Sequence, residues 1–146
     1  MRPDAFLDAL DEARVVAAIR EAESRSRAEI RVHVTDEPVV DVEAAAAAAF
    51  ERLGMTATAE RNGVLLFFAP ETQRFAVIGD AGIHGASVPG FWARVAETMA
   101  PHLRAGRFTD GVVAGVGAVG AELARLFPRR PGEADANELN DAVSRD

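Results

Sequence analysis

Three oxygen-bearing side chains, Glu29, Asn62 and Asp80, are the residues of this sequence best suited to bind a hard cation. Carboxylate, amide and backbone oxygens are the ligands that Ca²⁺ and Mg²⁺ prefer in proteins. Each residue also has an ordinary structural interpretation: Asp80 caps a loop, Asn62 forms a turn, and Glu29 is a solvated residue at the start of a strand. A cation site therefore depends on whether the fold brings the three side chains together.

A glycine-punctuated loop contains Asp80 and lies between a predicted strand and a predicted helix, where phosphate-binding loops also occur. The loop matches neither the G-x-G-x-x-G pattern nor the Walker A motif, and the chain has no lysine, because all 16 basic residues are arginine. We therefore expect no nucleotide cofactor. The loop residues that we consider for ligand binding are Gly79, Gly82, Gly85 and His84.

Nucleophilic and zinc chemistry have little support in the sequence. His84 and Ser87 are three residues apart, but no third triad member and no G-x-S-x-G elbow accompany them, so Ser87 is better explained as a helix N-cap. The chain has no cysteine, which excludes a disulfide, a thiolate nucleophile and Cys-ligated zinc. The histidines His33, His84 and His102 lack metal-ligand spacing, so we expect no zinc.

Composition places the chain among acidic globular domains: it has 146 residues, 49% hydrophobic and 27% charged, with a net charge of −7. The negative charge argues against a nucleic-acid partner, because phosphate binding needs a basic face. No apolar run approaches the ~20 residues that a membrane span requires. The first residues are acidic where a signal peptide would be basic and then apolar, so we expect a cytoplasmic location.

Hydrophobic periodicity predicts the elements that must position these residues. With their caps, the helices span about 4–25, 41–53, 87–103 and 109–127, the last capped by Thr109 or Asp110, and the strands span 29–35, 63–69 and 74–78. The first strand–helix–strand unit predicts a right-handed crossover with parallel strands, and the turn at 70–73 predicts an antiparallel hairpin. The result is a three-layer α/β/α sandwich, with a small mixed β-sheet and helices on both faces, over residues 1–127. Residues 128–146 are predicted to be a mobile acidic tail.

This topology decides which polar residues can meet. The third strand runs back beside the first two, so its end lies next to their beginnings. We therefore expect Glu29, the segment 61–63 and Asp80 to gather at one edge of the sheet. The acidic segment 36–41 follows the end of the first strand and should lie at the opposite edge.

Several segments, taken in order, carry a family resemblance. They are AEIRVHV at 28–34, RNGVLLFFA at 61–69 and RFAVIGDAGI at 74–83, with weaker matches in FW at 91–92, GRFTDGVVAGV from Gly106 and NEL near the C-terminus. Together they resemble the TPM-domain family, also called TPM phosphatase domains, which includes a plant thylakoid-lumen acid phosphatase. The chain looks like the short stand-alone bacterial form of this family.

The resemblance implies an α/β/α sandwich, binding of a divalent cation such as Ca²⁺, and phosphatase activity. We therefore expect a Ca²⁺- or Mg²⁺-binding domain with at most weak phosphatase activity. The candidate metal ligands are Asp80, Glu29, Asn62 and Asp110. The candidate phosphate-binding residues are Arg61, Arg74 and Arg107.

The alternative function is a non-enzymatic protein-interaction module in envelope or complex maintenance. It is suggested by the scarcity of catalytic residues and by the acidic tail with its NEL segment. No feature of the sequence identifies the protein partner or the oligomeric state.

Overall fold

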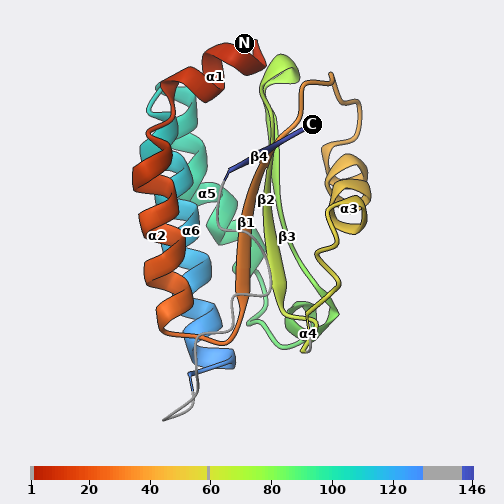
Figure 1. Cartoon of the computed structure of the whole chain (residues 1–146), viewed down its shortest axis with the longest axis vertical. Helices are drawn as coiled ribbons and strands as arrows, with labels where there is room; N and C mark the ends of the chain where they lie inside the picture. Colours follow the sequence, from red (N-terminus) through yellow and green to blue (C-terminus); the bar gives the residue numbers. More distant parts are fainter. Residues whose placement is uncertain (1, 59, 130–142) are drawn as a thin grey trace.

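The computed structural model describes residues 2–58, 60–129 and 143–146 and contains the predicted strands and helices in the predicted order (Figure 1). The strands are β1 (Glu29–Val34), β2 (Gly63–Ala69), β3 (Arg74–Gly79) and β4 (Ser144–Arg145). The helices are α1 (Pro3–Ala9), α2 (Glu12–Ser24), α3 (Val42–Arg52), α4 (Ala81–His84), α5 (Phe91–Arg104) and α6 (Phe108–Leu126), with a short 3-10 helix, η1 (Pro70–Thr72), between β2 and β3.

The four strands form one mixed sheet in the order β3-β2-β1-β4. β1 and β2 are parallel, with Glu29 opposite Gly63, and β2 and β3 are antiparallel, with Val64 opposite Gly79. Both pairings confirm the predicted crossover and hairpin. β4, which the hydrophobic pattern does not predict, pairs in parallel with β1 and places Ser144 opposite His33.

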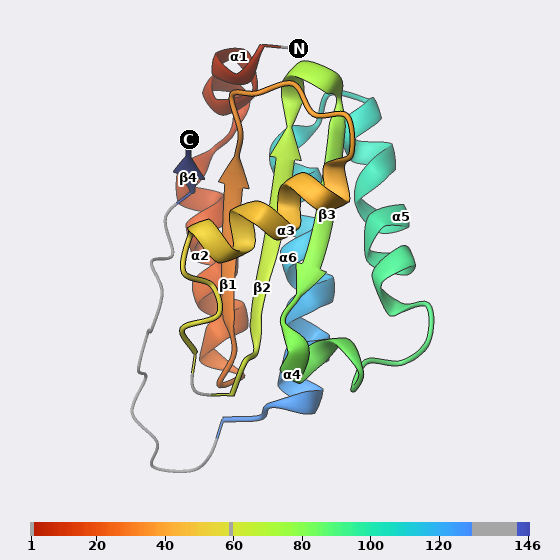
Figure 2. The ribbon, with the colours of Figure 1, turned by 90° about the vertical axis from the view of Figure 1, so that its right-hand side faces the viewer.

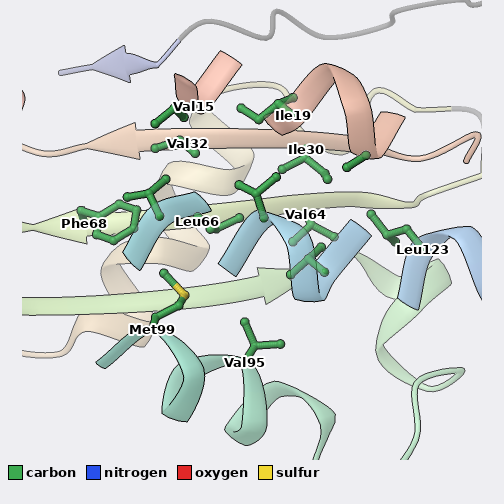
Figure 3. Packing of buried hydrophobic residues seen from close by; sticks show 14 of the residues in the cluster. Val15, Ile19, Ile30, Val32, Val64, Leu66, Phe68, Val95, Met99 and Leu123 are labelled. Carbon is green, nitrogen blue, oxygen red and sulfur yellow. The ribbon is translucent and has the colours of Figure 1, made fainter. Parts of the chain in front are cut away.

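Helices cover both faces of the sheet, which confirms the predicted α/β/α sandwich (Figures 1 and 2). α3 covers one face, which presents Leu65 and Phe67 of β2. α2, α5 and α6 cover the other face, which presents Val64, Leu66 and Phe68 of the same strand (Figure 3). Because both faces of β2 are buried, the strand is apolar throughout, as is typical of a central strand.

The helix α6 lies between α2 and α5, and its glycines allow close contact with both (Figure 2). A Cβ on Gly120 would lie 2.6 Å from Cβ of Ala22 in α2, and one on Gly115 would lie 2.5 Å from Sδ of Met99 in α5. The nearest neighbours of these two glycines are therefore the flanking helices. Within the described residues, no helix is both long and apolar enough to span a bilayer.

The first predicted helix is two helices in the structure. α1 ends at Ala9, and α2 begins after Asp11, whose side chain accepts a hydrogen bond from the Arg14 N–H at 3.2 Å as an N-cap. Phe6 of α1 packs against Phe68 and Phe108, with ring centroids 5.4 and 5.1 Å apart. This aromatic contact holds α1 over one end of the sheet.

Two predicted N-caps are wrong. α5 begins after Gly90, whose φ is 77°, while the Ser87 hydroxyl donates a hydrogen bond to the Ile83 carbonyl instead of capping a helix. α6 begins after Arg107, so neither Thr109 nor Asp110 is its N-cap. The Thr109 hydroxyl oxygen accepts the N–H of Asp11 at 3.0 Å, because the start of α6 lies against the α1–α2 junction.

Most of the predicted tail, including its NEL segment, lies outside the described residues. Near its end, Ser144–Arg145 forms β4, which pairs with β1. The start of α1 and the end of the chain thus meet near the carboxyl end of β1, where Arg145 pairs with Asp4 and Asp36.

Candidate functional site

The structure brings Glu29, Asn62 and Asp80 to one edge of the sheet, as the topology predicts. Glu29 begins β1 opposite Gly63, and the Asp80 N–H donates to the Gly63 carbonyl at 2.9 Å. The exposed fractions of Glu29, Asn62 and Asp80 are 3%, 1% and 6%, so all three are buried. Glu29 is therefore not the solvated residue that its ordinary structural interpretation assumes. This edge, at the amino ends of β1 and β2, is the candidate cation site.

The Asp80 carboxylate is bound by the guanidinium of Arg61. Nε donates to Oδ2 at 2.7 Å and Nη2 donates to Oδ1 at 2.9 Å, which is the bidentate geometry of a strong ion pair. The hydrogen bond to Asp80 and the charge of Asp80 raise the pKa of Arg61. Oδ1 also accepts the Ala81 N–H at 2.7 Å, so Asp80 caps the short helix α4 as well.

The backbone around Arg61 explains one of the loop glycines. Arg61 has a φ of 50°, and its carbonyl accepts the Gly82 N–H at 2.8 Å. A Cβ on Gly82 would lie 2.3 Å from the Glu60 carbonyl oxygen and 2.6 Å from that of Arg61. Gly82 therefore allows α4 to lie directly against the segment that carries Arg61 and Asn62.

The other loop residues have different surroundings. A Cβ on Gly79 would lie 2.8 Å from the ring of Trp92, so this indole packs onto the residue before Asp80. A Cβ on Gly85 would meet nothing within 4 Å. The side chain of His84 lies outside the described part of the structure. Ligand binding by these loop residues, and the expected lack of a nucleotide cofactor, remain sequence-based predictions.

Asn62 has one buried polar atom that finds no hydrogen-bond partner within the described residues. Its backbone N–H donates to the Thr58 hydroxyl at 3.1 Å, and its Nδ2 donates to the Arg27 carbonyl at 3.3 Å. Its Oδ1 is buried and accepts no hydrogen bond from the residues that the structure describes. Buried carbonyl oxygens normally have a partner, so this oxygen is free to bind a ligand.

The oxygens at this edge fit a hard cation in kind. Two carboxylates and one amide oxygen are suitable ligands for Ca²⁺ or Mg²⁺. Among the residues in 2–58, 60–129 and 143–146, no three His, Asp or Glu side chains lie close enough to hold a metal ion, so the amide oxygen would be needed as a ligand. Arg61 would also have to release at least one oxygen of Asp80.

The structure does not bring the other candidate residues to this edge. Asp110 lies at the start of α6 and pairs with Arg14 at 3.2 Å, at the end of the molecule that carries α1, whereas Asp80 lies beside α4 at the other end (Figure 1). Arg74 begins β3 opposite Ala69, and Arg107 lies 3.4 Å (Nε to Nδ1) from His102. Arg61 is therefore the one predicted phosphate-binding residue that contacts Asp80.

Arg74 lines a cavity of about 670 Å³ at the end of the molecule that carries α1. The cavity is bounded by α1, the β2–β3 turn and the end of α5, and its walls include Phe6, Phe75 and Arg104. It is separate from the candidate cation site, because Asp80 lies at the opposite end of β3.

A second polar cluster, which sequence reasoning does not predict, lies at the carboxyl end of β1. Asp146 Oδ1 accepts from His33 Nε2 at 2.7 Å and from Arg52 Nη2 at 3.1 Å. Asp146 Oδ2 accepts from the Thr35 hydroxyl and from the Asp36 N–H, the latter at 3.1 Å. No spacing signal could reveal the cluster, because Asp146 is 113 residues from His33 in the sequence.

Burial and hydrogen bonding act in opposite directions on Asp146. Burial by itself raises the pKa of this carboxyl. The hydrogen bonds from Thr35, His33 and the Asp36 N–H together lower the pKa by more than burial raises it, so the net pKa is below its ordinary value. The carboxylate is therefore ionised at neutral pH. His33, which binds this carboxylate, is itself only 1% exposed.

The sequence matches a known protein family, and the structure resembles solved structures. The family model described as TPM domain matches residues 1–122. The BA42 protein from the psychrophilic bacterium Bizionia argentinensis has 34% sequence identity and a TM-score of 0.84, and the match covers 92% of this chain and 92% of that chain.

Two further solved structures share the fold. The N-terminal domain of a P. gingivalis protein has 25% identity and a TM-score of 0.58, over 73% of this chain and 69% of that one. The N-terminal domain of the cg2496 protein from Corynebacterium glutamicum has 17% identity and a TM-score of 0.59, over 76% of this chain and 70% of that one. A search of curated proteins found no match.

Proposed function

The chain belongs to the TPM domain family, and on this basis we propose that it binds a divalent cation, Ca²⁺ or Mg²⁺, through Glu29, Asn62 and Asp80. The observation that carries the proposal is the buried Oδ1 of Asn62, which has no hydrogen-bond partner among the described residues. A buried polar atom without a partner costs about 1–3 kcal/mol. A bound cation would remove this cost. Cation binding is also what the resemblance to the family implies.

Arg61 competes with the cation for Asp80. The Arg61 side chain is 51% exposed, whereas that of Asp80 is 5% exposed, so the guanidinium can move into solvent while the carboxylate stays in place. A divalent cation in its place would compensate the Asp80 charge and contact the Asn62 oxygen. Binding of the ion and release of Arg61 are therefore coupled.

Phosphatase activity at this edge is proposed to be weak. A bound divalent cation would supply polarisation of a phosphoryl oxygen. Arg61, once released from Asp80, would be available to neutralise the phosphate charge. The nearby Ser87 hydroxyl donates to the Ile83 carbonyl, so it is not activated as a nucleophile. Ion binding is therefore the primary function that we assign to this edge.

Trp92 provides a direct probe of the site, because its ring packs onto Gly79, the residue before Asp80. We expect Ca²⁺ or Mg²⁺ to change the Trp92 fluorescence saturably and EDTA to reverse the change. At 100 times its dissociation constant, the ion should stabilise the fold by about 2.7 kcal/mol. For a domain of this size, that corresponds to a rise in Tm of about 5–10 °C.

Three variants sharpen this test. Asp80→Asn should abolish the fluorescence change and the rise in Tm, while Asp110→Asn, at the other end of the molecule, should preserve both. Arg61→Gln removes the competing guanidinium and should tighten cation binding by roughly threefold to tenfold. If the wild type does not respond to about 10 mM of either ion, above the range of weak calcium modules, the proposal is wrong.

Hydrolysis is tested separately with p-nitrophenyl phosphate. We expect a slow, cation-dependent rate that Asp80→Asn abolishes. An equal rate in the wild type and in Asp80→Asn would exclude metal-assisted hydrolysis at this edge, without affecting the conclusion on ion binding.

A further inference from the structure

The Asp146 carboxylate accepts hydrogen bonds from a set of donors that belong to the main fold. His33 comes from β1, Thr35 and the Asp36 N–H from the segment after it, and Arg52 from the end of α3. These donors bind both carboxylate oxygens, and two of them are charged or able to be charged. The arrangement has the donor chemistry of a carboxylate-binding site.

The principal donors are held by contacts that do not involve Asp146. The His33 ring is buried and stacks on Phe67, with ring centroids 5.9 Å apart and an interplanar angle of 20°. Thr35 is 4% exposed, and its hydroxyl oxygen also accepts the Glu37 N–H at 3.2 Å. The carboxylate that they bind lies on a segment that is held by a strand of only two residues, by the Ser144 hydroxyl, which lies 2.7 Å from His33 Nδ1, and by the ion pairs of Arg145 with Asp4 and Asp36. The donors are therefore preorganised, and the segment that carries the Asp146 carboxylate can detach from them.

The space around Asp146 is larger than its side chain requires. A cavity of about 600 Å³ continues from Asp146 between the segment after β1 and α3. Its wall includes apolar side chains, and one of them, Val40, is fully exposed. The apolar lining residues are Pro38, Val39, Val40, Ala45, Ala48 and Phe67. A ligand with a carboxylate head and a short apolar body fits this combination.

The charges at the rim select against more highly charged anions. Glu37 and Asp41 line the same cavity, and Asp36 lies beside the donors, where it pairs with Arg145. These acids repel a dianion such as phosphate more strongly than a monoanion. The ligand class is therefore a small monocarboxylate.

We propose that His33, Thr35, Arg52 and the Asp36 N–H form a binding site for a small apolar monocarboxylate, and that Asp146 occupies this site as an internal competitor. When the segment 143–146 leaves β1, the donors become available to the external carboxylate. This site is at the opposite edge of the sheet from the proposed cation site and does not depend on it.

The test uses the full chain carrying Asp146→Ala, with butyrate as the probe and the imidazole NMR resonances of His33 as the readout. We expect butyrate to shift these resonances saturably, with a dissociation constant at least about tenfold lower than in the wild type, in which Asp146 competes. Butyramide, which has the same shape without the charge, should cause no shift. Arg52→Ala in the same background should weaken butyrate binding.

Three results would overturn the proposal: no saturable shift in Asp146→Ala, equal shifts with butyrate and butyramide, or equal affinity in the variant and the wild type. If Asp146→Ala does not fold, Asp146→Ser removes the carboxylate and most of the side-chain volume and gives the same comparison. A fourth arm uses the peptide acetyl-Val-Ser-Arg-Asp-amide. Binding of this peptide without binding of butyrate would show a clasp for the chain's own segment, and would also overturn the small-molecule site.

Discussion

The two edges of the sheet each hold a carboxylate against an arginine, but they do so in opposite ways: the Asp80 side chain is 5% exposed and that of Asp146 is 23% exposed. Asp80 is bound by Arg61, 19 residues away, and caps the helix that follows it in the chain. Asp146 is bound by side chains of β1 and α3 that are about one hundred residues away. In the first case the carboxylate belongs to the main fold, and in the second case the donors do.

This difference determines what each edge can bind. At the Asp80 edge the fold supplies oxygen acceptors, and the exposed Arg61 is the group that can leave, so the ligand that we propose there is a cation. At the Asp146 edge the fold supplies donors, and the carboxylate is the group that can leave, so an incoming ligand must be an anion. Similar ion pairs therefore imply ligands of opposite charge, depending on which partner is fixed.

The largest loss of stability is expected from a substitution that disrupts packing at the Asp80 edge alone. Gly82→Ala should destabilise the fold by about 2–3 kcal/mol, because its Cβ would lie 2.3 Å from the Glu60 carbonyl oxygen and backbone must move. Gly85→Ala is the matched control, since its Cβ meets nothing within 4 Å, and should change stability by less than about 0.5 kcal/mol. Urea unfolding measures both. Equal effects of the two substitutions would contradict the close contact of α4 with the Glu60–Arg61 backbone.

A smaller effect is expected from neutralising the carboxylate at the other edge. Asp146→Asn keeps the shape of the side chain but loses the charge-assisted hydrogen bonds from His33 and Arg52, and should cost about 1 kcal/mol. The urea midpoint measures the cost, and the His33 imidazole resonances should shift at the same time. Unchanged resonances would show that Asp146 is not seated on the donors in solution.

The cost of Asp146→Asn should also depend on pH. The pKa of Asp146 is lower in the folded chain than in the unfolded chain, because hydrogen bonds from Thr35, His33 and the Asp36 N–H outweigh the effect of burial. Its stabilisation is therefore complete above the unfolded pKa and is lost as the pH falls through the folded pKa. The difference in unfolding free energy between wild type and Asp146→Asn should shrink between about pH 5 and pH 2. A difference that stays constant over this range would contradict an ionised Asp146.

The smallest effect is expected at a carboxylate that belongs to neither edge. Asp110 pairs with Arg14 on the surface, and their side chains are 45% and 54% exposed, so Asp110→Asn should cost no more than about 0.5 kcal/mol. It should leave the Trp92 response to cations and the His33 resonances unchanged. A loss of the cation response in this variant would show that a ligand set including Asp110 forms after all.

The arrangement of the strands could be predicted because it depends on local patterns and general rules. The continuous apolar run of β2 predicts a strand buried on both faces, and the connection from β1 to β2 predicts a parallel pair. From these two features alone, Glu29, Asn62 and Asp80 are expected at one edge, and the structure brings them there. The fold and the family membership thus follow from residues that are close in sequence or joined by a single crossover.

Tertiary structure alone decided how the polar side chains are paired. The sequence presents Asp80 as a loop cap or a metal ligand and Arg61 as a phosphate-binding residue, but only the fold shows that they bind each other. It also removes Asp110, Arg74 and Arg107 from the candidate cation site. The Asp146 site has no signal in the sequence, because hydrogen bonds between segments 113 residues apart depend on the final placement of backbone and side chains rather than on any periodic pattern.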